Sequence, residues 1–434
     1  MFARLLSLVI LALIAPRFAI AEPGVRGIVA QSNSLAAAFS ARPANGNVFQ
    51  IVPEKADIYS GDLLVSLPGA TLTAKNSAVT VKTLADFDGR SPLPILETAY
   101  SLAQPSEKDV DLELILDRGR INITNVKPDG VATVRVRFGD QSWKIVLDSP
   151  KTQVTFELCG RWTAGTRFQL ADPKTDPAKA PGPIASLVFL VLSGSASVDV
   201  GGATVAMRPP PGPAELRWNS VGGVRPQAQK LDKFPSWADP EAVLSDDAQK
   251  LAGACERFRK SRADDPATAF ETFLGSIDPI NQRVALINIG GLDDVERLEK
   301  TLGTAKTIPQ WDFGVTVLRH WLGRTRGNDQ QLYQLLTTRS GYTDAQSRIV
   351  LQLLLGFSPD DLTQPETFEV LIDYLGNSKP VIRNLAAWHL VRLVPQGKTL
   401  AFKPNASGED ARLYQLEWKK LIPSGKLPTV SKTP

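Results

Sequence analysis

The sequence has 434 residues, of which 43% are hydrophobic and 22% are charged. This composition is that of a globular protein large enough for two or three domains, and it excludes collagen-like, coiled-coil and wholly disordered chains. The formal net charge of +4 is too small to indicate a nucleic-acid partner. With 2 Cys and 2 His, the chain is a poor candidate for a zinc site, and we expect no metal or other cofactor.

The first 21 residues are typical of a secretory signal peptide. Arg4 gives a positively charged start, and residues 5–15 form an apolar run of 11 residues, short of the ~20 that cross a bilayer as a helix. Ala19 and Ala21 form an A-x-A site, so the sequence predicts cleavage after Ala21. An uncleaved membrane anchor is the alternative. We therefore expect a periplasmic or secreted protein whose mature chain has no transmembrane segment.

Residues 22–225 are predicted to form an all-β region. Short runs rich in Val, Ile, Leu and Thr are separated there by Gly, Pro, Asp and Asn, and apolar residues occupy every second position within 133–138. Many short strands joined by turns indicate an antiparallel sandwich or roll. The strands are predicted at 50–52, 58–67, 78–84, 110–116, 120–125, 131–138, 143–147, 154–158, 187–192 and 196–200. Hairpin connections are predicted at 117–119, 128–130, 139–140 and 193–195.

Secretion would permit a disulfide between the two cysteines, Cys159 and Cys255. Cys255 also lies on an apolar stripe at helical spacing, where a free cysteine behaves as a small hydrophobic residue. Sequence alone does not place the two Cα atoms within bonding range, so both interpretations stay open.

Three spaced parts of the β region resemble the FecR family of periplasmic sensor domains. They are 112–121, with a strand–Gly–strand pattern; 154–156 with 165–170, similar to a G-T-x-F-x-V segment; and 188–198 with 211–212, similar to the closing pattern of the family. The resemblance implies a periplasmic signalling domain. Members that regulate a sigma factor carry a cytoplasmic region and a spanning helix before this domain, whereas a cleavable signal precedes it here. A secreted or periplasmic recognition module is therefore favoured.

A linker with three Pro, residues 226–240, follows Gly222 and Gly223 and is predicted to separate the β region from an all-α region over 241–422. Asp239 and Pro240 are typical of an N-cap followed by the first helical residue. Residues 423–434 are predicted to be a loose C-terminal tail. Apolar residues recur at helical spacing in paired segments, namely 282–290 with 293–302, 313–323 with 329–336, 347–356 with 365–375, and 381–390, followed by a capping helix from 411.

Gly290, Gly323 and Gly356 lie 33 residues apart, and each is predicted to end a helix in the left-handed conformation. This period of helix–turn–helix units predicts an α-solenoid. The segments 276–285 and 377–386 resemble HEAT repeats, in which a turn Asp or Asn precedes an Arg and a small residue. The resemblance implies an extended surface for protein partners. The whole layout resembles uncharacterised secreted FecR-like bacterial proteins.

Two His–Trp neighbours fall on equivalent helices of the second and fourth units: His320 with Trp321, and Trp388 with His389. Together with Arg324, the residues His320, Trp321 and Trp388 are candidate binding residues, because an aromatic and imidazole patch on one groove would suit a peptide or a sugar. Packing is the alternative, since helical spacing places His389 in an apolar stripe and leaves His320 at the edge of its own stripe.

The sequence shows no phosphate-binding loop, dinucleotide fingerprint or zinc-protease helix, and no catalytic residue is predicted. We expect an exported, non-catalytic envelope protein that acts in recognition, scaffolding or signalling. Its expected partner is another envelope protein or a cell-wall glycan. A glycan-binding or glycan-processing hydrolase, with a site assembled from separated residues, is the alternative. Two carboxyl groups with perturbed pKa values in one cleft would favour the hydrolase.

Overall fold

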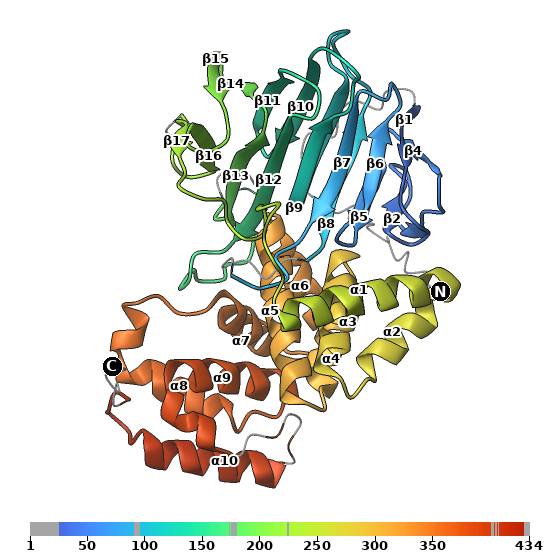
Figure 1. Ribbon diagram of the computed structural model, residues 1–434. Helices are drawn as coiled ribbons and strands as arrows, with labels where there is room; N and C mark the ends of the chain where they lie inside the picture. Colours follow the sequence, from blue (N-terminus) through green and yellow to red (C-terminus); the bar gives the residue numbers. More distant parts are fainter. Residues whose placement is uncertain are drawn as a thin grey trace, which may run out of the picture.

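The computed structural model describes residues 26–90, 96–172, 174, 180–223, 225–400, 403, 406 and 408–428. A β region lies at one end of the molecule and a helical region at the other (Figure 1). The predicted change from an all-β first half to an all-α second half is therefore confirmed. The predicted signal peptide and its cleavage site lie outside the described residues. Within the described part of the chain, no helix is both long and apolar enough to cross a membrane.

The β region contains two sheets, which we call sheet A and sheet B, and the strand β9 (Leu112–Asn125) belongs to both. Every described strand pair is antiparallel except β9 with β10. In spatial order, sheet A contains β4 (Asp57–Tyr59), β1 (Ile28–Ser32), β6 (Thr71–Ala74), β7 (Val79–Leu84), the second half of β9, β12 (Gln153–Arg161), β13 (Ile184–Ser193), β16 (Pro213–Asn219) and β17 (Gln229–Lys230). Sheet B contains β3 (Gln50–Ile51), β2 (Phe39–Arg42), β5 (Leu63–Ser66), β8 (Thr98–Ala103), the first half of β9, β10 (Ala132–Phe138), β11 (Gln141–Leu147), β14 (Ala196–Val200) and β15 (Ala203–Met207).

One hydrophobic core is formed by the inward faces of both sheets. Alternate residues of each strand point into it, such as Ile121 and Ile123 of β9 and Phe156 of β12. Trp143 of β11 is fully buried and packs edge-on against Phe138, with ring centroids 5.1 Å apart. This core explains why apolar residues in the first half located β7 and the strands from β9 to β14. The predicted strand 58–67 is two strands, β4 and β5, and the prediction missed β1, β2, β6, β8, β15, β16 and β17.

The predicted hairpin at 117–119 is wrong, because β9 runs through it as one strand that passes from sheet B to sheet A. Gly119 makes the transition possible with a φ of +93°, in the left-handed region that favours glycine. A Cβ atom there would lie 2.5 Å from Thr98 Cα, so the neighbouring strand could not approach. A Gly inside an apolar run can therefore mark a bend within a strand as well as a turn.

Two further hairpin predictions are wrong. The turn at 128–130 leads to β10, which pairs in parallel with the start of β9. The turn at 193–195 carries the chain from β13 in sheet A to β14 in sheet B, where β14 pairs with β11 and β15. The hairpin at 139–140 is confirmed by the pairing of β10 with β11. Turn residues show where the chain reverses, but they do not show which strands pair.

The predicted linker contains β17 and most of a packed segment, residues 231–244, which we call the strap. Phe234, Trp237 and Ala238 of the strap pack on Leu190 and Leu192 at the outer face of sheet A. The first helix begins at Asp246 with Ser245 as its N-cap, so the predicted start at Pro240 is wrong. Asp239 instead closes a turn, accepting a hydrogen bond from the Glu241 amide at 2.9 Å.

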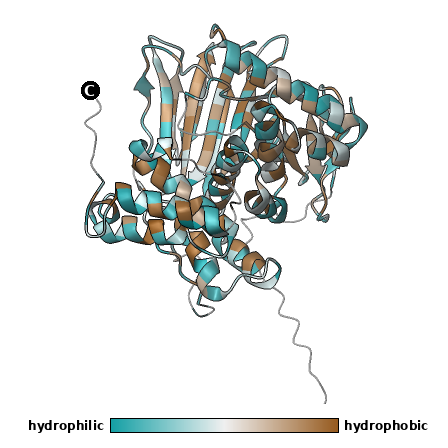
Figure 2. Cartoon of the chain, turned by 90° about the horizontal axis from the view of Figure 1, so that it is seen from below, coloured by the Kyte–Doolittle hydropathy of each residue, from teal (hydrophilic) through white to brown (hydrophobic). Residues whose placement is uncertain are grey.

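Ten α-helices follow in the described residues, and those from α3 to α10 lie close to the predicted positions, whereas α2 was not predicted. They are α1 (Asp246–Asp264), α2 (Pro266–Leu274), α3 (Pro279–Gly291), α4 (Val295–Thr304), α5 (Ile308–Arg324), α6 (Asn328–Thr338), α7 (Asp344–Leu355), α8 (Pro365–Tyr374), α9 (Pro380–Leu393) and α10 (Gly408–Leu421). Hydrophobic residues gather where these helices pack together, and hydrophilic residues turn outward (Figure 2).

The three spaced glycines have different roles. Gly356 caps α7 as predicted, with a φ of +86°, but its ψ of −163° is not that of the left-handed helical conformation. Gly290 and Gly323 each lie one residue before the end of α3 and α5, so the helix ends were predicted closely, but the left-handed conformation predicted for these two glycines is wrong. Gly290 is needed for close packing of α3 on α5, because a Cβ atom would lie 2.4 Å from Val317 Cγ1.

The helices do not stack as a simple line of pairs. α9 contacts α4 and α5 as well as α7 and α8. The Asn384 side chain of α9 donates a hydrogen bond to the Leu302 carbonyl of α4 at 3.0 Å. In a regular solenoid each unit contacts only its neighbours. The helical content is as predicted, and the assignment to a solenoid type remains a proposal.

Candidate functional site

The β and helical regions are joined directly where the end of β12 meets the end of α5. At Gly160 and Gly323 the two backbones touch, and a Cβ atom on Gly160 would lie 2.0 Å from the Gly323 carbonyl oxygen. The Trp162 indole donates a hydrogen bond to the Leu322 carbonyl at 3.0 Å. This contact leaves no room for a ligand between β12 and α5.

A buried ionic cluster lies beside the two glycines. Glu97, which comes just before β8, is 4% exposed, and its Oε1 lies 2.5 Å from Arg324 Nη2, 3.4 Å from His320 Nε2 and 3.6 Å from Arg118 Nε. Arg118 Nη2 also donates to the Gly291 carbonyl at 2.7 Å. Burial alone would raise the pKa of Glu97, but Arg324, His320 and Arg118 outweigh it and lower this pKa to about 2. Glu97 is therefore a carboxylate at neutral pH. We call Glu97, Arg118, Gly160, His320, Gly323 and Arg324 the junction.

The candidate binding residues do not form one groove. His320 and Arg324 belong to the junction, and Trp321 is 1% exposed in the helical core. Trp388 lies on another face, where its indole donates to Asp312 at 2.8 Å and the Arg392 guanidinium stacks 3.9 Å from its ring centroid.

His389 is buried, in agreement with the packing interpretation. Its Nε2 lies 2.6 Å from the Leu353 carbonyl oxygen, and burial lowers its pKa to about 4. The imidazole is therefore neutral near pH 7.

The FecR-like segment 165–170 is a loop that reaches the helical region. Phe168 stacks on Tyr333 of α6 with ring centroids 5.5 Å apart, and Arg167 forms an ion pair with Asp361 at 2.7 Å. The Gln330 side chain of α6 donates to the Gln169 carbonyl at 2.8 Å. This loop is a second contact between the two regions, in addition to the junction.

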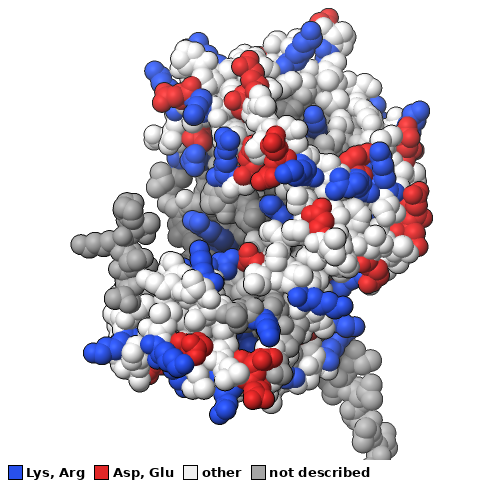
Figure 3. Space-filling view, turned by 60° about the horizontal axis from the view of Figure 1, so that its bottom comes forward, with Lys and Arg blue, Asp and Glu red and all other residues white. Residues whose placement is uncertain are grey.

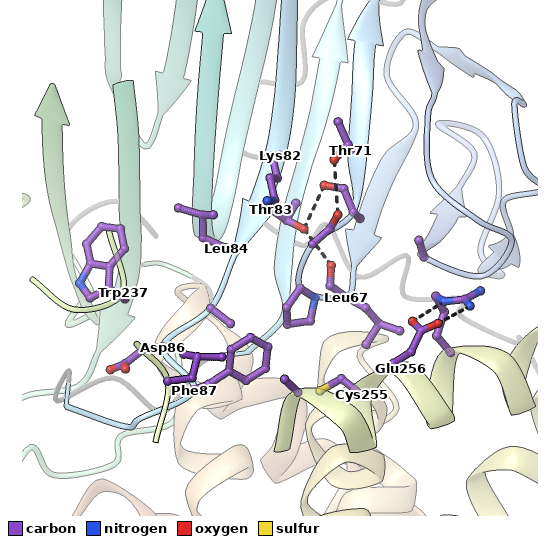
Figure 4. A pocket seen from close by; sticks show the side chains of 18 of the residues that line it. Leu67, Thr71, Lys82, Thr83, Leu84, Asp86, Phe87, Trp237, Cys255 and Glu256 are labelled. Atoms are coloured by element: carbon purple, nitrogen blue, oxygen red, sulfur yellow. Dashed lines mark hydrogen bonds and ion pairs between the residues drawn. The ribbon is translucent and has the colours of Figure 1, made fainter. Parts of the chain in front are cut away.

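A cleft of about 600 Å³ opens between the outer face of sheet A, the strap and α1 (Figure 4). We call it the sheet–α1 cleft. Its volume lies within the range typical of ligand sites. Its lining includes Ser34, Leu35, Thr71, Lys82, Leu84, Asp86, Phe87, Asp88, Trp237, Asp239, Leu244, Cys255, Glu256 and Arg259.

The alternation of side chains along β7 determines which residues form the floor of this cleft. In β7 the residues Val79, Val81 and Thr83 are buried, so Lys82 and Leu84 point outward to the cleft. Trp237 lies at one end and Glu256 at the other, with Phe87 between them (Figure 4).

The α1 wall is fixed by the side chain of Arg259. This guanidinium makes two hydrogen bonds to Glu256, at 2.7 and 2.8 Å, and a third at 2.8 Å to the Ala36 carbonyl of the β region. The hydrogen bond from Arg259 lowers the pKa of Glu256. Across the cleft, the Ser245 hydroxyl donates to Asp88 at 2.5 Å and lowers the pKa of that carboxyl group. Both acids are therefore carboxylates that accept hydrogen bonds.

Both cysteines are free and buried. Burial raises the pKa of each thiol to about 12, so each stays protonated near neutral pH. Cys255 is thus a free cysteine that packs as a small hydrophobic residue, and it does not form a disulfide with Cys159 in this structure. No group of three or more His, Cys, Asp or Glu side chains among the described residues is arranged to hold a metal ion.

Lys, Arg, Asp and Glu are interspersed over the face seen in Figure 3, without a broad patch of one sign. No known protein family matches the chain, and no curated protein or solved structure shows significant similarity to it.

Sequence reasoning missed the sheet–α1 cleft because its walls come from three distant segments. One available signal was the pair of aromatic residues Phe234 and Trp237 inside the Pro-containing linker. Large aromatic side chains in such a segment indicate that it packs against something.

Proposed function

We propose that the protein is an exported, non-catalytic recognition protein of the bacterial envelope, which holds its ligand in the sheet–α1 cleft. Export is inferred from the signal-like first 21 residues, and a FecR-like character from the three segments described above. The observation that carries the recognition role is the cleft itself, whose walls are fixed by Arg259, the strap and the junction before any ligand arrives. A preformed site loses less conformational entropy on binding.

The glycan-processing hydrolase is the second candidate. A general acid needs a carboxyl group whose pKa is raised toward neutrality, because it must carry a proton. In the cleft, the pKa values of Asp88 and Glu256 are lowered, by Ser245 and Arg259 respectively. These two acids are suited to accepting hydrogen bonds, which favours binding over hydrolysis.

The helical region would add a second surface for protein partners if it acts as a HEAT-like array. In its favour, Asp278 caps α3 by accepting from the Ile280 amide at 2.9 Å. The repeat arginine Arg283 stacks over Phe313 at 5.3 Å. The contact of α9 with α4 would make this array more compact than a linear one.

Site-specific cross-linking in living cells tests the recognition role. Val243 is 85% exposed between two residues that line the cleft, and Val221 is 67% exposed outside the lining. We expect a photo-reactive amino acid at position 243 to give a reproducible adduct that the same residue at 221 does not give. Equal labelling at both positions, or none at 243, would contradict the proposal. Amino-terminal sequencing of the mature protein tests export, with Glu22 expected first.

A further inference from the structure

We infer that the sheet–α1 cleft takes a neutral sugar chain. This inference rests on the proposed recognition function and names its ligand. Sugars present apolar C–H faces and hydroxyl edges at once, so a fitting site combines aromatic rings with both donors and acceptors of hydrogen bonds. The cleft offers this combination in its lining (Figure 4).

The aromatic part consists of Trp237 on the strap and Phe87 after β7. Both side chains are partly exposed at the cleft. The Arg120 guanidinium lies 5.3 Å from the Trp237 ring centroid and forms a hydrogen bond to Glu157 at 2.5 Å. Trp237 is thereby fixed by a buried ion pair, and Phe87 packs partly against the helical core. Rigid rings lose little entropy when a ligand stacks on them.

The polar part provides both donors and acceptors. Lys82 is exposed on the floor and can donate, while the carboxylates of Asp88 and Glu256 accept. The hydroxyl groups of Ser34 and Thr71 lie on the same floor, where each donates to a backbone carbonyl, so toward a ligand they act as acceptors. A ligand with many hydroxyl groups can accept a hydrogen bond from Lys82 and donate hydrogen bonds to the carboxylates.

The charge of the lining argues against an anionic ligand. Four acids, Asp86, Asp88, Asp239 and Glu256, line the cleft together with two cations, Lys82 and Arg259. A phosphate or a polyanionic glycan would meet net repulsion there.

The sheet topology argues against an extended peptide. β6 is paired on both sides, with β1 and β7, and β7 is paired with β6 and β9. No free strand edge faces the cleft from these floor strands, so a peptide backbone could not extend the sheet there. Recognition on this floor must come from side chains, which suits a sugar.

Isothermal titration calorimetry of the intact mature protein tests the inference, with tetra-N-acetylchitotetraose, cellotetraose and maltotetraose as neutral probes. We expect saturable binding of at least one. Phe87→Ala should weaken it at least about fivefold by removing a stacking ring. Lys82→Ala, an exposed substitution that leaves packing intact, should weaken the same binding, and Lys75→Ala outside the cleft should not. Thermal unfolding of each variant confirms that it is folded.

Three results would overturn the inference. They are no binding of any neutral tetrasaccharide, sugar binding that both cleft variants leave unchanged, and sugar binding that is weakened by Lys75→Ala but by neither cleft variant. An adduct at position 243 that contains a protein, combined with no sugar binding, would reject the sugar and keep the recognition function. Equal labelling at 243 and 221 would reject the recognition function itself.

Discussion

The junction and the sheet–α1 cleft are two places where the β and helical regions face each other, and they differ in kind. At the junction, glycine backbones touch and a carboxylate is buried among cations, so the contact is closed. At the sheet–α1 cleft, the same two regions are linked by hydrogen bonds such as that from Arg259 to the Ala36 carbonyl, and they leave about 600 Å³ between them. The comparison teaches that a rigid contact at one place can keep a second place open, because it fixes how the sheet and α1 lie relative to one another.

The largest expected effect comes from Glu97→Gln. The substitution leaves Arg324 and Arg118 buried beside a neutral amide, and breaking a buried ion pair in this way costs about 3–5 kcal/mol. We expect a loss of that order in the free energy of unfolding at pH 7, measured by urea denaturation. Glu107→Gln is the control, because Glu107 is 44% exposed in its pairs with Arg135 and Lys144 and should matter little.

The pH dependence sharpens the same test. The folded protein holds the pKa of Glu97 at about 2, below its ordinary value of 4.5. Its stabilising effect is therefore complete above about pH 4.5 and is lost as the pH falls toward 2, by on the order of 3 kcal/mol. The wild type should lose this stability in that window. A Glu97→Gln profile as steep as that of the wild type would show that other groups are responsible.

The next effect is expected from Gly323→Ala. The added Cβ atom would lie 2.5 Å from the Gly160 carbonyl oxygen and 2.9 Å from Arg161 Cα, so backbone must move. We expect a loss of about 1–3 kcal/mol in the free energy of unfolding. Gly253→Ala in α1 is the matched control, since its Cβ would meet the flexible end of Arg257 at 3.4 Å. That variant should be neutral or slightly stabilised. An equal change in the free energy of unfolding for Gly323→Ala and Gly253→Ala would show that the close backbone contact at Gly323 does not contribute to stability.

A smaller effect is expected from Phe168→Ala in the loop that reaches α6. Losing the stack on Tyr333 should cost about 1–2 kcal/mol and make the loop more sensitive to protease in limited proteolysis. Leu170→Ala, at a side chain that is 44% exposed, should change neither property. A Phe168→Ala protein with wild-type protease resistance would argue against this contact.

The smallest effect is expected from Lys82→Ala on stability. Lys82 points from the floor of the cleft to solvent, so the free energy of unfolding should change by less than about 0.5 kcal/mol. Differential scanning calorimetry measures this change in stability, with Lys75→Ala as the control variant. A clear loss would mean that the cleft floor takes part in holding the two regions together.

The sequence predicts the helices well because their signals are local. Pro279, Pro365 and Pro380 begin three of the predicted helices, and apolar residues at helical spacing mark the buried faces. The helix α2 and the strands β1, β2, β6, β8, β15, β16 and β17 were missed, whereas the positions of β7 and of β9 to β14 were predicted for the same reason. Pairing was not, because the residues of a turn carry no information about distant partners, as the parallel pair of β9 with β10 shows.

The cleft could not be predicted because it is a product of tertiary structure. Lys82, Trp237 and Arg259 come from segments far apart in the sequence, and each has an ordinary local explanation. His320 and Arg324 illustrate the opposite error. Helical spacing placed His320 at an edge, but it could not show that Glu97 of the β region contacts both His320 and Arg324.

The double membership of β9 has a consequence for how the chain is made. Strands that precede β9 lie on one side of it in each sheet, and strands that follow lie on the other side. Until residue 125 has been synthesised, β7 and β8 are therefore two bare edges, the kind of surface through which nascent chains aggregate. One strand then covers both edges in a single step and offers two new ones for the remainder of the β region.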